Sequence, residues 1–159
     1  MTDMLVKLYN LPPLEAVLAQ QTAKGITIRR AIPPEKHNIL QWIRVNFSEF
    51  WVSEADIAMS RSPIPCFVAI EDAHLIGFSC HDISAKGFFG PTGVGEKGRG
   101  RGTGAALLLA SLHDLHAMGY AYGIIGGVGP IEFYERVAGA TVIPDSTPSI
   151  YNGLLRTGE

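Results

Sequence analysis

Residues 94–109, with the sequence VGEKGRGRGTGAALLL, carry glycine at every second position from Gly98 to Gly104 and then change abruptly to alanine and leucine. Alanine and leucine favour a helix, so the glycine-rich segment lies directly before a helix start. The first N–H groups of a helix have no intrahelical acceptor, and the helix dipole adds positive potential there. Glycine permits positive φ and a close approach of the backbone to a ligand. The stretch therefore predicts a phosphate-binding loop, to which Arg99 and Arg101 can add charged contacts.

The segments on either side of this loop follow the order strand, loop, helix, strand. Residues 87–94 are apolar, the leucines of 103–118 recur on one helix face, and 120–127 has the pattern of another strand. Such a βαβ unit requires a parallel strand pair with a right-handed crossover. Gly90 and Pro91 interrupt the first strand, and proline removes a hydrogen-bond donor from the ladder. We therefore expect an α/β fold in which this strand separates from a neighbour.

The remaining elements are predicted from hydrophobic periodicity and from the positions of proline and glycine. We expect a second helix capped by Ser53, and a short helix that has Pro130 as its first residue. The other expected elements are an edge strand at 4–11, helices at 12–25, 33–47 and 131–138, and strands at 26–32, 66–70, 74–80, 141–142 and 150–155.

Composition limits the classes of function. The chain has 159 residues, 47% of them hydrophobic, which predicts a single domain over residues 1–159. A formal net charge of −2 gives no general attraction to nucleic acid or to an anionic membrane, so anion binding must be local. The sequence has no signal-peptide pattern and no apolar run near the roughly 20 residues that cross a bilayer. We expect a cytoplasmic protein.

Cysteine and histidine give little sign of a metal site. Cys66 and Cys80 face each other if their segments pair as a hairpin, and we expect buried apolar side chains, with a redox or metal role as the alternative. His113 and His116 lie three residues apart on the long helix, a spacing that binds a metal only where a third ligand converges. Asp114 alone is close in sequence, so we predict a polar helix face and no metal.

Three phosphate-binding patterns can be compared with the loop. A Walker A loop requires lysine after its last glycine, and none is present. Residues 100–105, GRGTGA, fit the dinucleotide pattern GxGxxA, but no acidic residue follows about 20 positions later. The third pattern is arginine or glutamine, two residues, glycine, one residue, then glycine or alanine, and Arg99, Gly102 and Gly104 fill it. Over residues 26–155 the sequence resembles the GNAT acetyltransferase superfamily.

This resemblance implies a GNAT fold, with a mixed central sheet, two splayed parallel strands and flanking helices. It implies an acetyl-CoA-dependent N-acetyltransferase that transfers acetyl directly to a primary amine of a small molecule or peptide, with no metal. A backbone N–H near Val94 would stabilise the oxyanion. Dimers are common among similar proteins, so a homodimer is left open. The residues implied to bind acetyl-CoA are Val94, Arg99, Gly100, Arg101, Gly102, Thr103 and Gly104.

The catalytic residue implied by the resemblance is Tyr134, which would act as general acid toward the departing thiolate; the alternative is an aromatic core residue. Gly127 and Pro130 replace the family's usual asparagine and alanine. These departures favour the rival interpretation, a CoA-binding sensor or interaction module without transfer activity. A base must also take a proton from the amine, whose ordinary pKa is about 10. The candidate bases are Glu54, His81, Asp82 and Glu132.

An aromatic cluster follows the first long helix and has two interpretations. Similar proteins place this segment beside the acceptor, so the side chains either line the acceptor pocket or fill the core. The cluster consists of Trp42, Phe47, Phe50 and Trp51.

Overall fold

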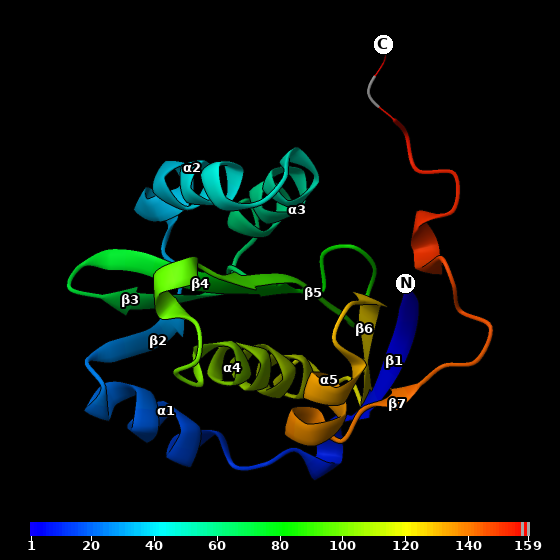
Figure 1. Ribbon diagram of the computed structural model, residues 1–159, viewed down its shortest axis with the longest axis horizontal. Helices are drawn as coiled ribbons and strands as arrows, with labels where there is room; N and C mark the ends of the chain where they lie inside the picture. Colours follow the sequence, from blue (N-terminus) through cyan, green and yellow to red (C-terminus); the bar gives the residue numbers. More distant parts are fainter. Residues whose placement is uncertain (157, 159) are drawn as a thin grey trace.

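The computed structural model describes residues 1–156 and 158. It contains a seven-stranded mixed sheet in the order β2-β3-β4-β5-β6-β1-β7, with helices on both faces (Figure 1). Only β5 and β6 pair in parallel. The strands are β1 (Thr2–Lys7), β2 (Ile26–Arg30), β3 (Cys66–Glu71), β4 (His74–His81), β5 (Phe88–Val94), β6 (Tyr122–Val128) and β7 (Thr141–Val142). The α-helices are α1 (Leu14–Ala23), α2 (Lys36–Asn46), α3 (Glu49–Met59), α4 (Thr103–Ala117) and α5 (Ile131–Ala138).

The predicted βαβ unit is confirmed, and its two strands separate early. β5 and β6 pair only through Phe88 with Ile124 and Phe89 with Ile125. The next residue of β5, Gly90, has φ of 127°, a conformation that favours glycine, and Pro91 after it has no N–H to donate. The two strands therefore stay paired at one end and separate at the other.

β6 contributes to the separation from its own side. Gly127 has φ of 58°, and its N–H donates to the buried Asp3 carboxylate in β1 at 2.9 Å. The pairing of β1 with β6 is irregular at this point. The end of β6 is thus held toward β1 and away from β5.

Hydrophobic packing fixes the helices on the two faces. As the leucine spacing predicts, Leu108, Leu112 and Leu115 of α4 are buried together, against a cluster that includes Met4 and Ile125 of the sheet. Figure 1 shows α1, α4 and α5 on this face and α2 and α3 on the other. The sheet therefore positions α3 and α4 on opposite sides of the strand separation.

The prediction of an edge strand at 4–11 is wrong about the edge: a strand forms at Thr2–Lys7, but it lies inside the sheet. β1 lies between β6 and β7, because Leu5 pairs with Ile124 on one side and Thr141 on the other. Met4 and Val6 are completely buried. The partners lie more than a hundred residues away in the sequence, so no local pattern reveals them.

Three local predictions also need correction. Ser48 rather than Ser53 caps α3, because its hydroxyl accepts from the Trp51 N–H and the helix begins earlier than expected. Pro130 stands one position before α5, with extended backbone. The expected strand at 150–155 is absent from the described residues; Ser149–Tyr151 instead forms a 3₁₀ turn that starts with φ of 65° at Ser149.

The cysteine prediction is confirmed. Cys66 and Cys80 are opposite each other on β3 and β4, and both are free and buried. The hydrogen bond with Cys66, together with burial, raises the pKa of the Cys80 thiol well above its ordinary value. Both thiols pack as apolar groups under α2 and α3. Within residues 1–156, no helix combines the length and apolar character needed to cross a membrane.

Candidate functional site

The glycine loop forms an open turn at the start of α4. Gly100 and Gly102 have φ of 77° and 80°, so both adopt the left-handed conformation that favours glycine. Gly102 is the N-cap residue, and in the described part of the chain no side chain caps the helix. The first intrahelical bond runs from the Ala106 N–H to the Gly102 carbonyl at 3.1 Å. The preceding amides are therefore available to an anionic ligand, as the sequence predicts.

A buried glutamine of α1 holds the loop in this shape, and no sequence pattern predicts this role. Gln21 is only 2% exposed. Its Nε2 donates to the Arg101 carbonyl at 2.9 Å, and its Oε1 accepts from the Thr103 hydroxyl at 2.8 Å. Lys24 Nζ donates to the same carbonyl at 2.8 Å. These three hydrogen bonds hold the loop backbone against α1 without help from a ligand.

The two arginines of the loop have different environments. The Arg101 guanidinium pairs with both carboxylate oxygens of Glu71, and this hydrogen bonding raises the pKa of Arg101 and lowers that of Glu71. Arg99 is exposed and donates through Nε to the Val94 carbonyl at 3.2 Å. Arg101 therefore holds the loop against β3 through its ion pair with Glu71. Arg99 is instead exposed to solvent beside the loop.

The backbone of Val94 faces the side on which β5 and β6 separate. The Gly95 N–H donates to the Ile76 carbonyl of β4 at 2.8 Å. Successive N–H groups of a strand point to opposite sides, so the Val94 N–H points away from β4. This is the direction needed for an oxyanion donor in the separation.

A cavity of about 640 Å³ occupies the separation of β5 and β6 on the α3 side. Apolar side chains make up most of its wall, and three glycines line it at the end of β6 and just after the strand: Gly126, Gly127 and Gly129. Its lining comes from five parts of the chain: Met1 before β1, α3 with its start, β5, the end of β6 with α5, and the C-terminal segment. The residues are Met1, Ser48, Phe50, Trp51, Ser53, Glu54, Phe89, Gly90, Pro91, Thr92, Ile125, Gly126, Gly127, Val128, Gly129, Pro130, Tyr134, Tyr151 and Leu154.

Tyr134 lines this cavity from α5. Its side chain is 8% exposed, and its ring contacts Phe89 and Phe133 edge-on, with centroids 6.5 and 5.0 Å apart. Burial raises the pKa of the hydroxyl above its ordinary value of 10.0, so the phenol keeps its proton at neutral pH. Among the described residues no side chain bonds to this hydroxyl. Tyr134 thus presents a protonated donor to the cavity.

No family model and no curated protein matches the sequence. Several solved structures do match. One is a GCN5-related glucosamine N-acetyltransferase region of a fungal multi-domain β-N-acetylglucosaminidase, which matches 89% of this chain with a TM-score of 0.73 and 17% identity. A GCN5-related N-acetyltransferase from Sphaerobacter thermophilus matches 89% with a TM-score of 0.66 and 23% identity. The chain has the GCN5-related N-acetyltransferase fold. It spans 19% and 48% of those two proteins.

Within this N-acetyltransferase fold, the structure separates the four candidate bases. Glu54 alone of them lines the cavity, and it accepts a hydrogen bond from the Ser84 hydroxyl. Glu132 is exposed on α5, outside the cavity lining. The Asp82 carboxylate stabilises a turn, where it accepts from the Gly87 N–H at 2.7 Å and the Tyr120 hydroxyl at 2.8 Å.

His81, the fourth candidate, belongs to a buried network on the α4 side. It is completely buried, and its Nε2 lies 2.6 Å from the Asp114 carboxylate. Arg30 donates to both oxygens of Asp114, at 2.7 and 3.2 Å. Burial alone would raise the pKa of Asp114, but the hydrogen bonds from His81 and Arg30 outweigh it and lower the pKa to about 2. The network joins β2, β4 and α4 and does not reach the cavity.

The C-terminal segment supplies cavity residues that the sequence did not identify. Tyr151 lies against Gly127, where an added Cβ would be 3.4 Å from the tyrosine ring. Burial, with Glu54 and Asp3 nearby, raises the pKa of the Tyr151 hydroxyl, against the opposing effect of a hydrogen bond with Ser84. Tyr151 and Ser84 therefore form a polar group around the Glu54 carboxylate.

The aromatic cluster is divided between the cavity wall and the core. Phe50 and Trp51 line the cavity. Trp42, Phe47 and Trp51 pack around Phe78 in the core, with ring centroids 6.1–6.2 Å from it. The two roles meet at Trp51, which links the core to the cavity wall.

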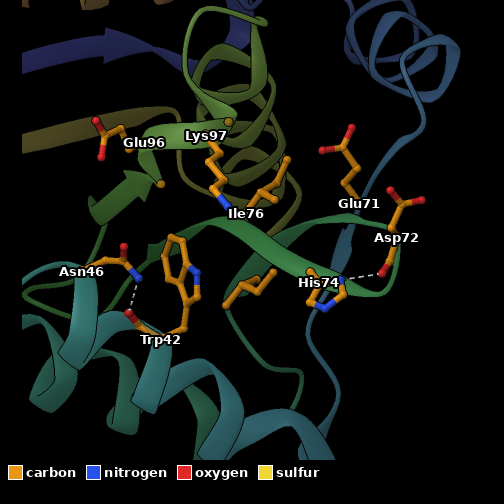
Figure 2. Close-up of a pocket in the computed structure, with 11 residues that line it drawn as sticks. Trp42, Asn46, Glu71, Asp72, His74, Ile76, Glu96 and Lys97 are labelled. Carbon is orange, nitrogen blue, oxygen red and sulfur yellow. Dashed lines mark hydrogen bonds between the residues drawn. The ribbon is translucent and has the colours of Figure 1, made fainter.

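A second cavity, of about 630 Å³, lies on the other side of β5 between α2, the start of β4 and residues 95–98. Figure 2 shows Lys97 reaching into it from that turn, with Trp42 on the α2 side. Two of its polar side chains bond within their own segments: His74 to the Asp72 carbonyl at 2.7 Å and Asn46 to the Trp42 carbonyl at 2.9 Å. Tyr134 and the strand separation lie outside it.

No three metal-binding side chains converge anywhere in the described residues. His113 Nε2 lies 2.8 Å from the Pro12 carbonyl, a contact that links α4 to the segment before α1.

Proposed function

We propose that this protein is an acetyl-CoA-dependent N-acetyltransferase that transfers acetyl directly to a primary amine. The observation that supports the proposal is the placement of three features along β5. A loop without a described side-chain cap follows the end of the strand, the Val94 N–H points away from β4, and Tyr134 lines the cavity beside Phe89. Val94 and the loop residues are not part of the described cavity lining. In this assignment Arg99 and the backbone of residues 100–104 bind the pyrophosphate.

The chemistry follows from the residues of the cavity. Glu54 takes a proton from the ammonium form of the acceptor, and the free nitrogen lone pair attacks the thioester carbonyl carbon. The new C–N bond places negative charge on the carbonyl oxygen, which the Val94 N–H stabilises. The C–S bond then breaks, and the thiolate takes the proton of the Tyr134 hydroxyl. The surplus proton on the acylated nitrogen passes to the tyrosine oxygen, directly or through water, and Glu54 releases its proton to solvent. The amine, with an ordinary pKa of about 10, needs its base more than a thiol near 8.5 needs its acid.

Calorimetric titration with acetyl-CoA, with NADH and ATP as competitors, tests the ligand. The Gly102→Val variant tests the loop: valine at φ of 80° strains the backbone, and we expect acetyl-CoA to bind at least about tenfold more weakly. The matched control is Gly119→Val, at φ of 107° beyond the far end of α4, where an added Cβ meets no described atom within 4 Å. Equal weakening in both variants, or unchanged affinity in a folded Gly102→Val protein, would contradict the assignment.

A CoA-binding module without transfer activity is the second candidate. It is favoured by Gly127, whose N–H is occupied by Asp3, and by Pro130, which has no N–H. Neither residue can offer its amide to a ligand in the cavity. An acceptor panel separates the two candidates, because only the transferase releases CoA in proportion to the amine supplied.

A further inference from the structure

Glu54 is a carboxylate without a cationic partner at the edge of an apolar cavity. Its described hydrogen-bond partner is the neutral Ser84 hydroxyl, and no described Lys, Arg or His side chain forms an ion pair with it. No other described lining residue has a charged side chain. A ligand that fills the cavity removes water from this carboxylate, which is costly unless the ligand brings a positive charge.

The rest of the cavity offers hydrophobic contact and few free polar groups. Trp51, Phe89 and Ile125 come from three different elements of its wall. The Thr92 hydroxyl already donates to the Phe78 carbonyl at 3.0 Å. A ligand with many hydroxyl groups would leave several of them without partners, and each unpaired group would weaken binding.

We propose that the acceptor is a hydrophobic primary monoamine, such as an arylalkylamine, whose ammonium group binds Glu54 while its carbon skeleton packs among Trp51, Phe89 and Tyr151. This proposal rests on the proposed function and names its substrate class. The cavity disfavours amino sugars, because its described lining has few free partners for their hydroxyl groups. It disfavours polyamines, because the described lining has no second carboxylate for their other ammonium groups. Free amino acids are disfavoured because their own carboxylate would approach Glu54 with no cation to offset it.

The first experiment measures acetyl transfer to four acceptors: phenethylamine, glucosamine, spermidine and phenylalanine. We expect kcat/KM for phenethylamine to exceed each of the others by about 100-fold or more, as unpaired polar groups and uncompensated charge require. A preference for any of the other three overturns the proposal.

The second experiment measures binding without chemistry, by titrating phenethylamine and its neutral analogue phenethyl alcohol into the protein saturated with CoA. We expect the amine to bind about tenfold more tightly than the alcohol, and this advantage to vanish in Glu54→Gln, which keeps the shape of the side chain. The matched control is Glu15→Gln, at an exposed position of α1 outside the cavity. Equal binding of amine and alcohol to the unmodified protein, or an advantage that survives in Glu54→Gln, overturns the proposal.

The two proposals fail in distinguishable ways. If neither acetyl-CoA nor CoA binds, the same titrations are made without CoA; an amine that then keeps its Glu54-dependent advantage over the alcohol means that the proposed transfer is wrong and the amine site stands. If acetyl-CoA binds and a hydrophilic acceptor is acetylated best, the transfer stands and the acceptor class is wrong.

Discussion

Asp114 and Glu54 are two partly buried carboxylates whose surroundings are opposite. Asp114 receives hydrogen bonds from two cationic or basic side chains, Arg30 and His81, in a packed region between α4 and the sheet. Among the described residues, Glu54 has only the Ser84 hydroxyl as a hydrogen-bond partner, and it lines a cavity. A compensated carboxylate holds the structure together, whereas an uncompensated one at a cavity is suited to bind a ligand or move a proton. The comparison predicts that changes in the Asp114 network affect stability and that changes around the cavity affect activity.

The largest expected effect is on stability. Asp114→Ala leaves the buried His81 and the partly buried Arg30 without their shared acceptor, and we expect the free energy of unfolding to fall by about 3 kcal/mol. Denaturant unfolding followed by circular dichroism measures this change. The matched control is Glu135→Ala, on the exposed side of α5, which should change stability by no more than about 0.5 kcal/mol. A similar loss in both variants would contradict the structural role of the network.

The pH dependence of stability sharpens the same point. The pKa of Asp114 is lowered from 3.8 to about 2 in the folded protein, so its contribution is present above about pH 4 and is lost as the pH falls toward 2. The shift corresponds to roughly 2 kcal/mol. We expect the stabilities of the unmodified protein and of Asp114→Asn to converge over this range. A difference that is as large at pH 2.5 as at pH 7 would count against the ion-paired state of Asp114.

The sequence could not distinguish these two carboxylates, although it predicted the loop. The loop is one continuous segment, and its glycines, Arg99 and the following helix can be recognised locally. The cavity is assembled from parts of the chain as far apart as Trp51 and Tyr151, and the placement of β1 beside β6 depends on similarly distant partners. The sequence therefore cannot rank the candidate bases Glu54, His81, Asp82 and Glu132, because only tertiary contacts distinguish their surroundings.

The cavity side of the comparison predicts a loss of activity at constant stability. Tyr134→Phe removes a hydroxyl to which no described side chain bonds, so stability should change by less than about 1 kcal/mol. Because thiolate is a tolerable leaving group, we expect kcat to fall only about tenfold, with the affinity for acetyl-CoA unchanged. Steady-state kinetics and calorimetry measure both quantities. The control is Tyr122→Phe, which alters an exposed tyrosine that pairs with Tyr9 outside the cavity. An unchanged kcat in Tyr134→Phe would leave Tyr134 with a packing role.

Gln21 tests whether structural and ligand-binding groups are separate sets of residues, because it is nearly as buried as His81 of the Asp114 network and yet holds the glycine loop. Replacing it with leucine keeps an apolar contact but removes the bonds to the Arg101 carbonyl and the Thr103 hydroxyl. We expect acetyl-CoA to bind roughly fivefold more weakly, as the loss of about 1 kcal/mol of loop organisation requires. The neighbouring Gln20→Leu change, at an exposed position of the same helix, provides the control. Equal affinities for acetyl-CoA in the two variants would mean that the glycines and the Arg101–Glu71 pair shape the loop without α1. A loss of affinity in Gln21→Leu alone would mean that the buried hydrogen bonds of Gln21 contribute to ligand binding.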